Sequence, residues 1–147
     1  MIALLDVNML VALFDEDHVH HQIAHDWFED NKEAGWASCP LTENGLLRVF
    51  SNPAFIDPPV PLPELSGLLK RFSERSTHHF WFDDISLPDP AVFLMPAVRG
   101  YRQLTDVYLL GLAVKHRGKL VTLDSGVPLG AVVGAKREHL EVITPDS

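Results

Sequence analysis

Four acidic residues stand at positions from which their carboxylates can act together. They are Asp6, Glu43, Asp106 and Asp124. Asp6 and Asp124 each close a short apolar run, LLD and VTLD, whereas Glu43 and Asp106 fall in the first turns of predicted helices. Carboxylates gathered in a cleft of low dielectric constant repel one another unless cations neutralise them. Oxygen ligands without His or Cys suit Mg²⁺, with Mn²⁺ as the alternative.

Such a cation centre has a definite chemistry. A bound divalent ion can lower the pKa of a water molecule, orient it and neutralise charge on a phosphodiester, so the pattern favours metal-assisted phosphodiester hydrolysis. Each acid also has an ordinary explanation. An aspartate at a strand end commonly caps a helix or forms a turn, and Glu43 or Asp106 can simply favour a helix dipole. On the residues alone, both interpretations stay open.

The positions of the four acids depend on a predicted alternation of strands and helices. The predicted strands are Ile2–Asp6, Trp36–Cys39, His79–Phe82, Lys119–Asp124 and Glu141–Thr144. The predicted helices are Asn8–Phe14, His18–Ala34, Pro40–Phe50, Leu65–Ser76, Pro90–Arg99 and Thr105–His116. This order predicts one α/β domain, residues 1–147, with a parallel sheet of four to five strands between two helical layers. Ligands bind outside the carboxyl ends of such strands, so the four acids are expected on that edge.

Polar residues and glycines set the predicted helix ends. Asn8 and Thr105 are expected to cap the helices that they precede, and Gly35 and Gly118 are expected to end helices. The segment Ser51–Pro63 holds five of the eleven prolines, which predicts a stiff loop inside the domain.

Several segments together resemble the PIN-domain ribonucleases. The four acidic segments LLDVN (Leu4–Asn8), LTEN (Leu41–Asn44), LTDVYLLGLA (Leu104–Ala113) and VTLDSG (Val121–Gly126) are similar, in order and spacing, to the acidic motifs of that family. More narrowly, they resemble the VapC toxins of bacterial toxin–antitoxin pairs. The segment RVFSNPAF (Arg48–Phe55) also resembles the sequence after the glutamate in a subgroup of those toxins.

The resemblance implies a three-layer fold, a Mg²⁺-dependent endoribonuclease activity, a homodimer and inhibition by a small cognate antitoxin. Asp6 and Asp106 would then be the principal metal ligands, with Glu43 and Asp124 completing the acidic pocket directly or through water. Asn8 matches a polar position beside the first acid, where it would orient Asp6 or a bound water. Capping of the following helix explains Asn8 equally well.

Composition and charge limit the alternatives. The net charge of −8 disfavours nucleic-acid binding at first, because phosphate contacts need Lys and Arg. A local basic rim can still hold a backbone, although each cation can equally be a solvated surface charge. The candidates are Arg48, the group Lys70, Arg71 and Arg75, the pair Arg99 and Arg102, and the pair Lys115 and Arg117. With no membrane-length apolar run, no signal peptide and one cysteine, Cys39, the chain is expected in the cytoplasm.

Other candidate residues receive structural explanations. The helical pair His21 and His25, with His18 and His20 nearby, could hold zinc, but no cysteine or second ligand motif accompanies them. The tryptophans Trp27, Trp36 and Trp81 could stack bases, yet core packing is the simpler explanation.

Two other functions compete with the nuclease. A phosphatase or dehalogenase with an aspartate nucleophile would need an acid where Asn8 stands and a lysine after a later strand, where SGVPLG follows Asp124. A PIN-like module that only binds RNA or protein would have lost acids, and all four are present.

Overall fold

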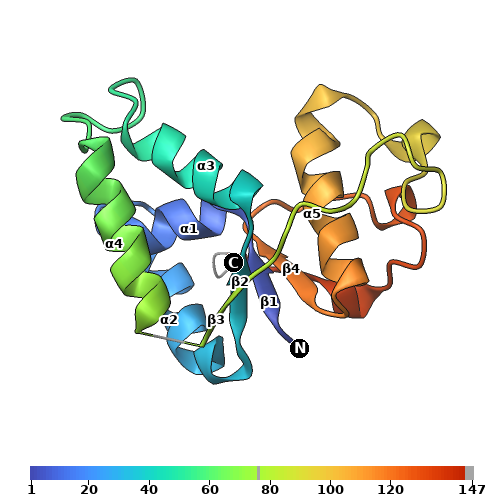
Figure 1. The fold of residues 1–147 in the computed structure, drawn as a ribbon, viewed down its shortest axis with the longest axis horizontal. Coiled ribbons are helices and arrows are strands. Elements are labelled where there is room, and N and C mark those ends of the chain that lie inside the picture. Colours follow the sequence, from blue (N-terminus) through green and yellow to red (C-terminus); the bar gives the residue numbers. More distant parts are fainter. Residues whose placement is uncertain (76, 145–147) are drawn as a thin grey trace.

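A five-stranded parallel sheet forms the middle layer of the computed structural model, which describes residues 1–75 and 77–144 (Figure 1). In chain order its strands are β1 (Ala3–Leu5), β2 (Trp36–Ser38), β3 (His78–Phe80), β4 (Lys119–Thr122) and β5 (Leu140–Val142). Their spatial order is β3-β2-β1-β4-β5, and every neighbouring pair is parallel. All five carboxyl ends therefore meet at one edge, as the sequence predicted.

Helices cover both faces of this sheet. The helices α1 (Val7–Phe14), α2 (His21–Asn31), α3 (Pro40–Phe50) and α4 (Leu62–Glu74) lie on one side in Figure 1, and α5 (Leu104–Lys115) lies on the other. The predicted three-layer α/β/α architecture is confirmed. No helix in the described part of the chain is long and apolar enough to cross a membrane.

The strands bury side chains on both faces, so the protein has two hydrophobic clusters. Leu5 and Val121 pack with the first four helices, whereas the neighbouring Leu4 and Leu120 pack with α5. All four side chains are fully buried. This alternation explains why the strands are continuous apolar runs, as parallel strands covered on both faces usually are.

Two predicted helices differ from the observed structure. The segment Pro90–Arg99 is not an α-helix, because Phe93 forms an antiparallel bridge with Val132 and only Met95–Ala97 makes a short 3₁₀ turn. The helix predicted from His18 begins at His21, after a turn in which the His18 amide donates to the Asp15 carbonyl.

Smaller differences concern the residues at which other helices and strands begin and end. The helix predicted over Leu65–Ser76 begins at Leu62, and its predicted last residue, Ser76, lies outside the described residues. The third strand begins and ends earlier than predicted, at His78 and Phe80, and the fifth covers Leu140–Val142.

The predicted helix caps were wrong in an informative way. Asp6, not Asn8, is the N-cap of α1, and its Oδ1 accepts a 2.7 Å hydrogen bond from the Val7 amide. Thr105 does not cap α5, because Gln103 holds that position without a side-chain hydrogen bond and Thr105 is exposed within the first turn.

Gly118 serves contact with the sheet rather than helix termination. The left-handed residue after α5 is Arg117, with a φ of +56°. A Cβ on Gly118 would lie 2.4 Å from the Ile2 carbonyl oxygen, so glycine allows the chain to enter β4 directly beside β1.

Candidate active site

Three aspartates meet at the carboxyl edge of the sheet. Asp6 directly follows β1, Asp124 follows β4 after one intervening residue, and Asp106 lies in the first turn of α5. The Gln103 side chain donates to the Gly126 carbonyl at 3.2 Å, which ties the start of α5 to the loop that carries Asp124. The predicted convergence of these three acids is therefore observed.

Their electrostatics show how closely the three carboxyl groups interact. Burial, followed by the charge of Asp6 and by hydrogen bonding with Asp124, raises the pKa of Asp106 to about 8. Burial also raises the pKa of Asp6, whereas its hydrogen bond from Thr122 opposes the shift. In the absence of a cation, the protein keeps at least one of these groups protonated near neutral pH.

The Asp6 carboxylate is held at both oxygens. Its Oδ1 accepts from the Val7 amide, and its Oδ2 accepts a 2.7 Å hydrogen bond from the Thr122 hydroxyl. Its side chain is buried, with only 4% of the residue exposed. Two fixed hydrogen bonds give the carboxylate a defined orientation, in which it also interacts with Asp106.

Thr122 also connects the neighbouring groups. Its hydroxyl oxygen accepts from the Asp124 amide at 3.0 Å and from the Asn8 side-chain amide at 3.1 Å. The Oδ1 of Asn8 in turn accepts from the Leu123 amide at 3.1 Å. Asn8 therefore orients Asp6 through Thr122, which agrees with one of the two roles considered for it and excludes helix capping.

Asp124 is the most exposed of the three aspartates and has a local role as well. Its Oδ1 accepts from the Gly126 amide at 2.8 Å, a turn-forming bond. The ordinary explanation for this aspartate is thus correct, and its contact with Asp106 exists beside it.

Glu43 stands apart from the aspartates. Its Oε2 accepts a 2.7 Å hydrogen bond from the buried Ser38 hydroxyl, which also lies 2.7 Å from Nε2 of His78 on β3. Because the Ser38 hydrogen points to Glu43, His78 must donate its Nε2 hydrogen to the serine oxygen. Glu43 is not among the groups that shift the pKa of Asp6 or Asp106.

A glycine brings the start of α3 close to the start of α1. A Cβ on Gly45 would lie 2.5 Å from Cγ2 of Val7, so only glycine permits this approach. Val7 directly follows Asp6, and Gly45 lies two residues after Glu43. This contact sets the separation between the glutamate and the aspartate cluster.

Similar proteins decide the family. Over 143 residues the chain is 43% identical to Ribonuclease VapC44 of Mycobacterium tuberculosis, covering 97% of this chain and all of that protein. Ribonuclease VapC38 of the same organism is 44% identical over 85% of this chain and 86% of its own length. Ribonuclease VapC39, also of Mycobacterium tuberculosis, is 36% identical over 91% of this chain and 96% of its own length.

The chain belongs to the VapC family. A search for matching family models found none.

The carboxylates of this VapC protein can be compared with the ligands that Mg²⁺ takes in proteins. No three His, Cys, Asp or Glu side chains in residues 1–75 and 77–144 are arranged as a complete cation site. Magnesium, however, is commonly held by one or two carboxylates together with waters and substrate phosphates. Asp6 and Asp106 supply such a pair, and a nearby cation would oppose the burial and the charge of Asp6 that raise the pKa of Asp106. The residues therefore fit Mg²⁺ as partial ligands.

Sequence reasoning missed two polar residues of this VapC site. Thr122 and Ser38 were not singled out, although their hydroxyl groups donate to two of the acids. The available indication was a hydroxyl residue inside a short, otherwise apolar strand: Thr122 and Ser38 are both fully buried. A buried hydroxyl needs a hydrogen-bond partner, and here the partners are carboxylates.

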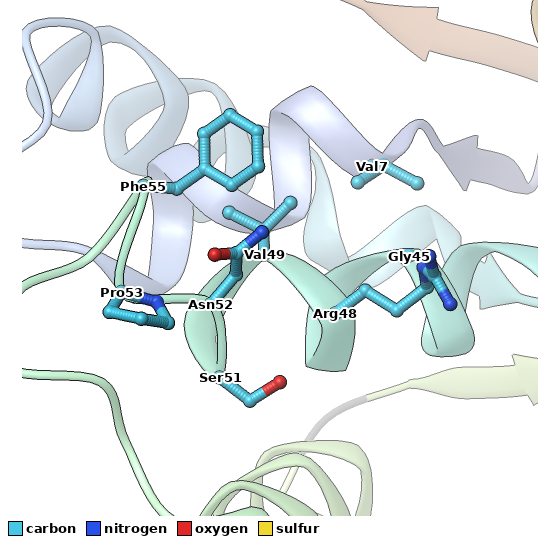
Figure 2. A pocket seen from close by; sticks show the side chains of 8 residues that line it. All are labelled: Val7, Gly45, Arg48, Val49, Ser51, Asn52, Pro53 and Phe55. Atoms are coloured by element: carbon cyan, nitrogen blue, oxygen red, sulfur yellow. The ribbon is translucent and has the colours of Figure 1, made fainter.

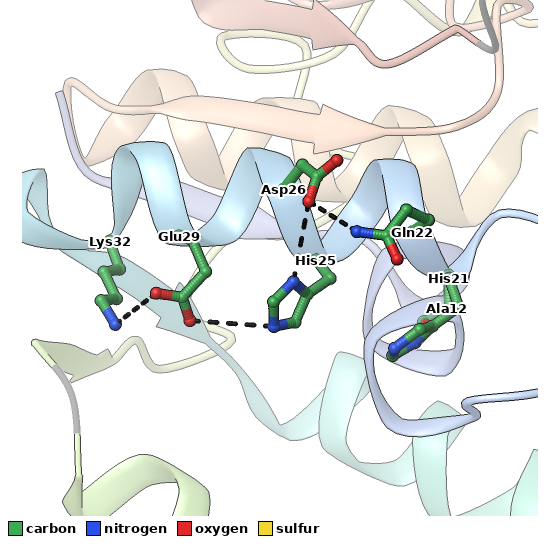
Figure 3. A network of polar contacts seen from close by, with 7 residues as sticks. All are labelled: Ala12, His21, Gln22, His25, Asp26, Glu29 and Lys32. Atoms are coloured by element: carbon green, nitrogen blue, oxygen red, sulfur yellow. Dashed lines mark hydrogen bonds and ion pairs between the residues drawn. The ribbon is translucent and has the colours of Figure 1, made fainter.

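The histidines at the start of α2 make local contacts (Figure 3). Nδ1 of His21 lies 2.7 Å from the Ala12 carbonyl oxygen, and His25 lies within 4.0 Å of Asp26 and Glu29. Among the described residues, no group of three or more His, Cys, Asp or Glu side chains is placed to hold a metal ion.

The tryptophans and the cysteine are core residues, as interpreted. Trp27, Trp36 and Trp81 are between 1% and 9% exposed. Burial raises the pKa of the Cys39 thiol to about 11, so the thiolate is scarce at neutral pH.

Proposed function

We propose that this VapC protein is a Mg²⁺-dependent endoribonuclease and the toxin of a type II toxin–antitoxin pair. The observation that carries the proposal is whole-length similarity to proteins named ribonucleases, together with three interacting aspartates at the carboxyl edge of the sheet. A phosphatase with an aspartate nucleophile is disfavoured, because Asn8 stands where a second acid would be needed and SGVPLG, without a lysine, follows Asp124.

In this mechanism Asp6 and Asp106 would hold the metal ion. When bound, the ion supplies a water of lowered pKa and neutralises charge on the scissile phosphodiester. Thr122 fixes the orientation of the Asp6 carboxylate, and Asp106, whose raised pKa favours its protonated form, would have to lose its proton to bind a cation. Asp124 adds negative charge at the exposed side of the cluster.

Glu43 has a separate task in the proposal. The hydrogen bond from Ser38 fixes one of its oxygens, so the other is available to orient the attacking water or to complete the metal site through water. The proposed partners are an RNA substrate, a cognate antitoxin protein and a second copy of the chain. The proposed location is the cytoplasm.

A cleavage assay with a mixed RNA pool tests the activity. The wild type should cut in Mg²⁺ and stop when a chelator is added. Asp6→Asn and Asp106→Asn should each lose at least about 100-fold of the rate, the scale expected for an essential catalytic group. Asp30→Asn, an exposed substitution on α2, is the matched control and should cut at the wild-type rate. Folded variants at Asp6 and Asp106 that cut normally would refute the assigned site.

A further inference from the structure

A cavity of about 570 Å³ lies along α3 and the loop that follows it (Figure 2). Six of its eight lining residues come from the segment Arg48–Phe55, and the other two are Val7 and Gly45. Its volume falls within the range of about 300–1,000 Å³ that is usual for ligand sites. The aspartate cluster makes no use of this segment.

One end of the cavity lies at Val7, the residue next to Asp6. Val7 directly follows Asp6 and donates its amide hydrogen to that carboxylate. Gly45 lies two residues after Glu43 on α3. Figure 2 shows Val7 and Gly45 at one end of the cavity and Phe55 at the other. An RNA strand bound at Asp6 would thus pass Val7, the residue at this end of the cavity.

The lining combines a cation with an exposed aromatic ring. Arg48 is exposed and takes part in none of the ion pairs formed among the described residues. Phe55 is 69% exposed, which is unusual for a phenylalanine.

The loop holds that ring in place. The Asn52 carbonyl accepts from the Phe55 amide at 3.0 Å, and the Asn52 side chain accepts from the Ala54 amide at 2.9 Å. The backbone that carries Phe55 is thus anchored to the end of α3, and the exposed ring is presented from a defined turn.

We propose that this cavity binds a nucleotide of single-stranded RNA next to the scissile bond. Arg48 binds a backbone phosphate, and Phe55 stacks on a base. The inference rests on the proposed function and names a substrate subsite for it. A chain with a net charge of −8 needs local cations to hold a polyanion, and stacking on an exposed ring adds affinity with little sequence preference.

The same features argue against a protein occupant. A basic partner that suits the aspartate edge would meet the positive charge of Arg48 on entering this cavity. Among the other predicted rim cations, Lys115 is paired with Asp84 at 2.7 Å and lies at the end of α5 that leads to the amino end of β4. Arg48 is the cation that lines this cavity.

Direct binding in a chelator tests the subsite without cleavage. Anisotropy of a labelled single-stranded oligoribonucleotide should show Arg48→Ala binding about tenfold more weakly, with a salt slope smaller by about 0.7, the value for one lost phosphate contact. Phe55→Ala should also lose about tenfold, with the salt slope unchanged, since stacking carries no charge. Phe55→Trp should keep the affinity, whereas the apolar Phe55→Leu should not.

Two matched controls separate this site from general surface effects. Arg137→Ala removes an exposed cation just before the amino end of β5. The aspartates lie at the carboxyl ends of the strands, at the opposite edge of the sheet. Phe82→Ala removes a ring that is 70% exposed and does not line the cavity. Both should bind RNA like the wild type.

Cleavage kinetics and oligomeric state complete the test. In Mg²⁺, both cavity variants should raise KM about tenfold and leave kcat nearly unchanged, because they touch no reacting atom. If the wild type cleaves and both variants match its Kd and KM, the subsite is refuted and the nuclease function stands. If Phe55→Ala alters the sedimenting mass but not RNA affinity, the cavity belongs to a protein interface and the inference fails. A wild type that neither binds nor cleaves RNA refutes both proposals.

Discussion

The hydroxyl of Thr122 donates a 2.7 Å hydrogen bond to Oδ2 of Asp6, so the last residue of β4 orients the carboxylate that follows β1. The same oxygen accepts from the Asp124 amide and from the Asn8 side chain. A buried threonine thereby links the two acids that follow adjacent strands, and it joins the first helix to them through Asn8.

Removing this hydroxyl should damage both activity and stability. Thr122→Val keeps the shape but leaves Asp6 with one fewer donor and two amide donors without an acceptor. We expect a loss of about 1–3 kcal/mol in the free energy of unfolding and at least tenfold in kcat. Thr122→Ser, which retains the hydroxyl, should recover most of the activity. Urea denaturation and single-turnover cleavage measure the two effects. Normal cleavage by a folded Thr122→Val protein would show that Asp6 needs no such positioning.

The sequence was enough to place acids at the carboxyl edge of the sheet. Two apolar runs each lead to an aspartate, and the carboxyl ends of parallel strands lie at the same edge. The position of Asp106 followed from the helical pattern before β4. The caps could not be assigned in the same way, since Asp6 and Asn8 are both good capping residues and only the packed structure shows which side chain reaches the helix amides. The helix predicted over Pro90–Arg99 was wrong for a related reason. Phe93 in this segment pairs with Val132, about 40 residues later, and no local sequence pattern reveals that contact.

The hydrogen-bond chain behind Glu43 offers a second test. Ser38→Ala should lower kcat about tenfold by releasing the Glu43 carboxylate, and His78→Phe should have a smaller effect in the same direction. Ser38→Ala should cause little further loss when added to Glu43→Gln, because residues that act through one contact are not additive. Ser73→Ala, which removes a hydroxyl bonded to the Leu69 carbonyl on α4, is the control. Fully additive losses in this cycle would mean that Ser38 does not act through Glu43.

Expression of the chain alone should arrest growth of the host. This prediction follows from family membership, and Asp6→Asn and Asp106→Asn should relieve the arrest at equal protein levels. Co-expression of the gene neighbouring this one in its native genome should relieve it as well, if that gene encodes the antitoxin. Growth curves with immunoblots measure both. Normal growth of cells that accumulate soluble, RNA-cleaving protein would contradict a toxin function.

The stability of the metal-free protein should fall as the pH rises toward 8. Asp106 has an ordinary pKa of 3.8 and one of about 8 in the folded protein. Between these values the folded state keeps a proton that the unfolded chain has released, so raising the pH favours unfolding. Asp106→Asn keeps the shape and removes the charge. In chelator at pH 8, it should therefore be more stable than the wild type by about 1 kcal/mol and should show a flatter pH dependence.

Magnesium should make the wild type more stable than Asp106→Asn, the reverse of the order in chelator. Millimolar Mg²⁺ binds the folded wild type and should raise its Tm by mass action, whereas Asp106→Asn should respond much less. Asp30→Asn, which changes the net charge equally at an exposed position, should follow the wild type in every condition. If Asp106 were only a favourable charge at the start of α5, Asn would lower stability slightly and Mg²⁺ would have no effect. Thermal melts of the three proteins, in chelator and in Mg²⁺ from about pH 5 to 8, distinguish these outcomes because the sign of the Asp106→Asn effect differs between them.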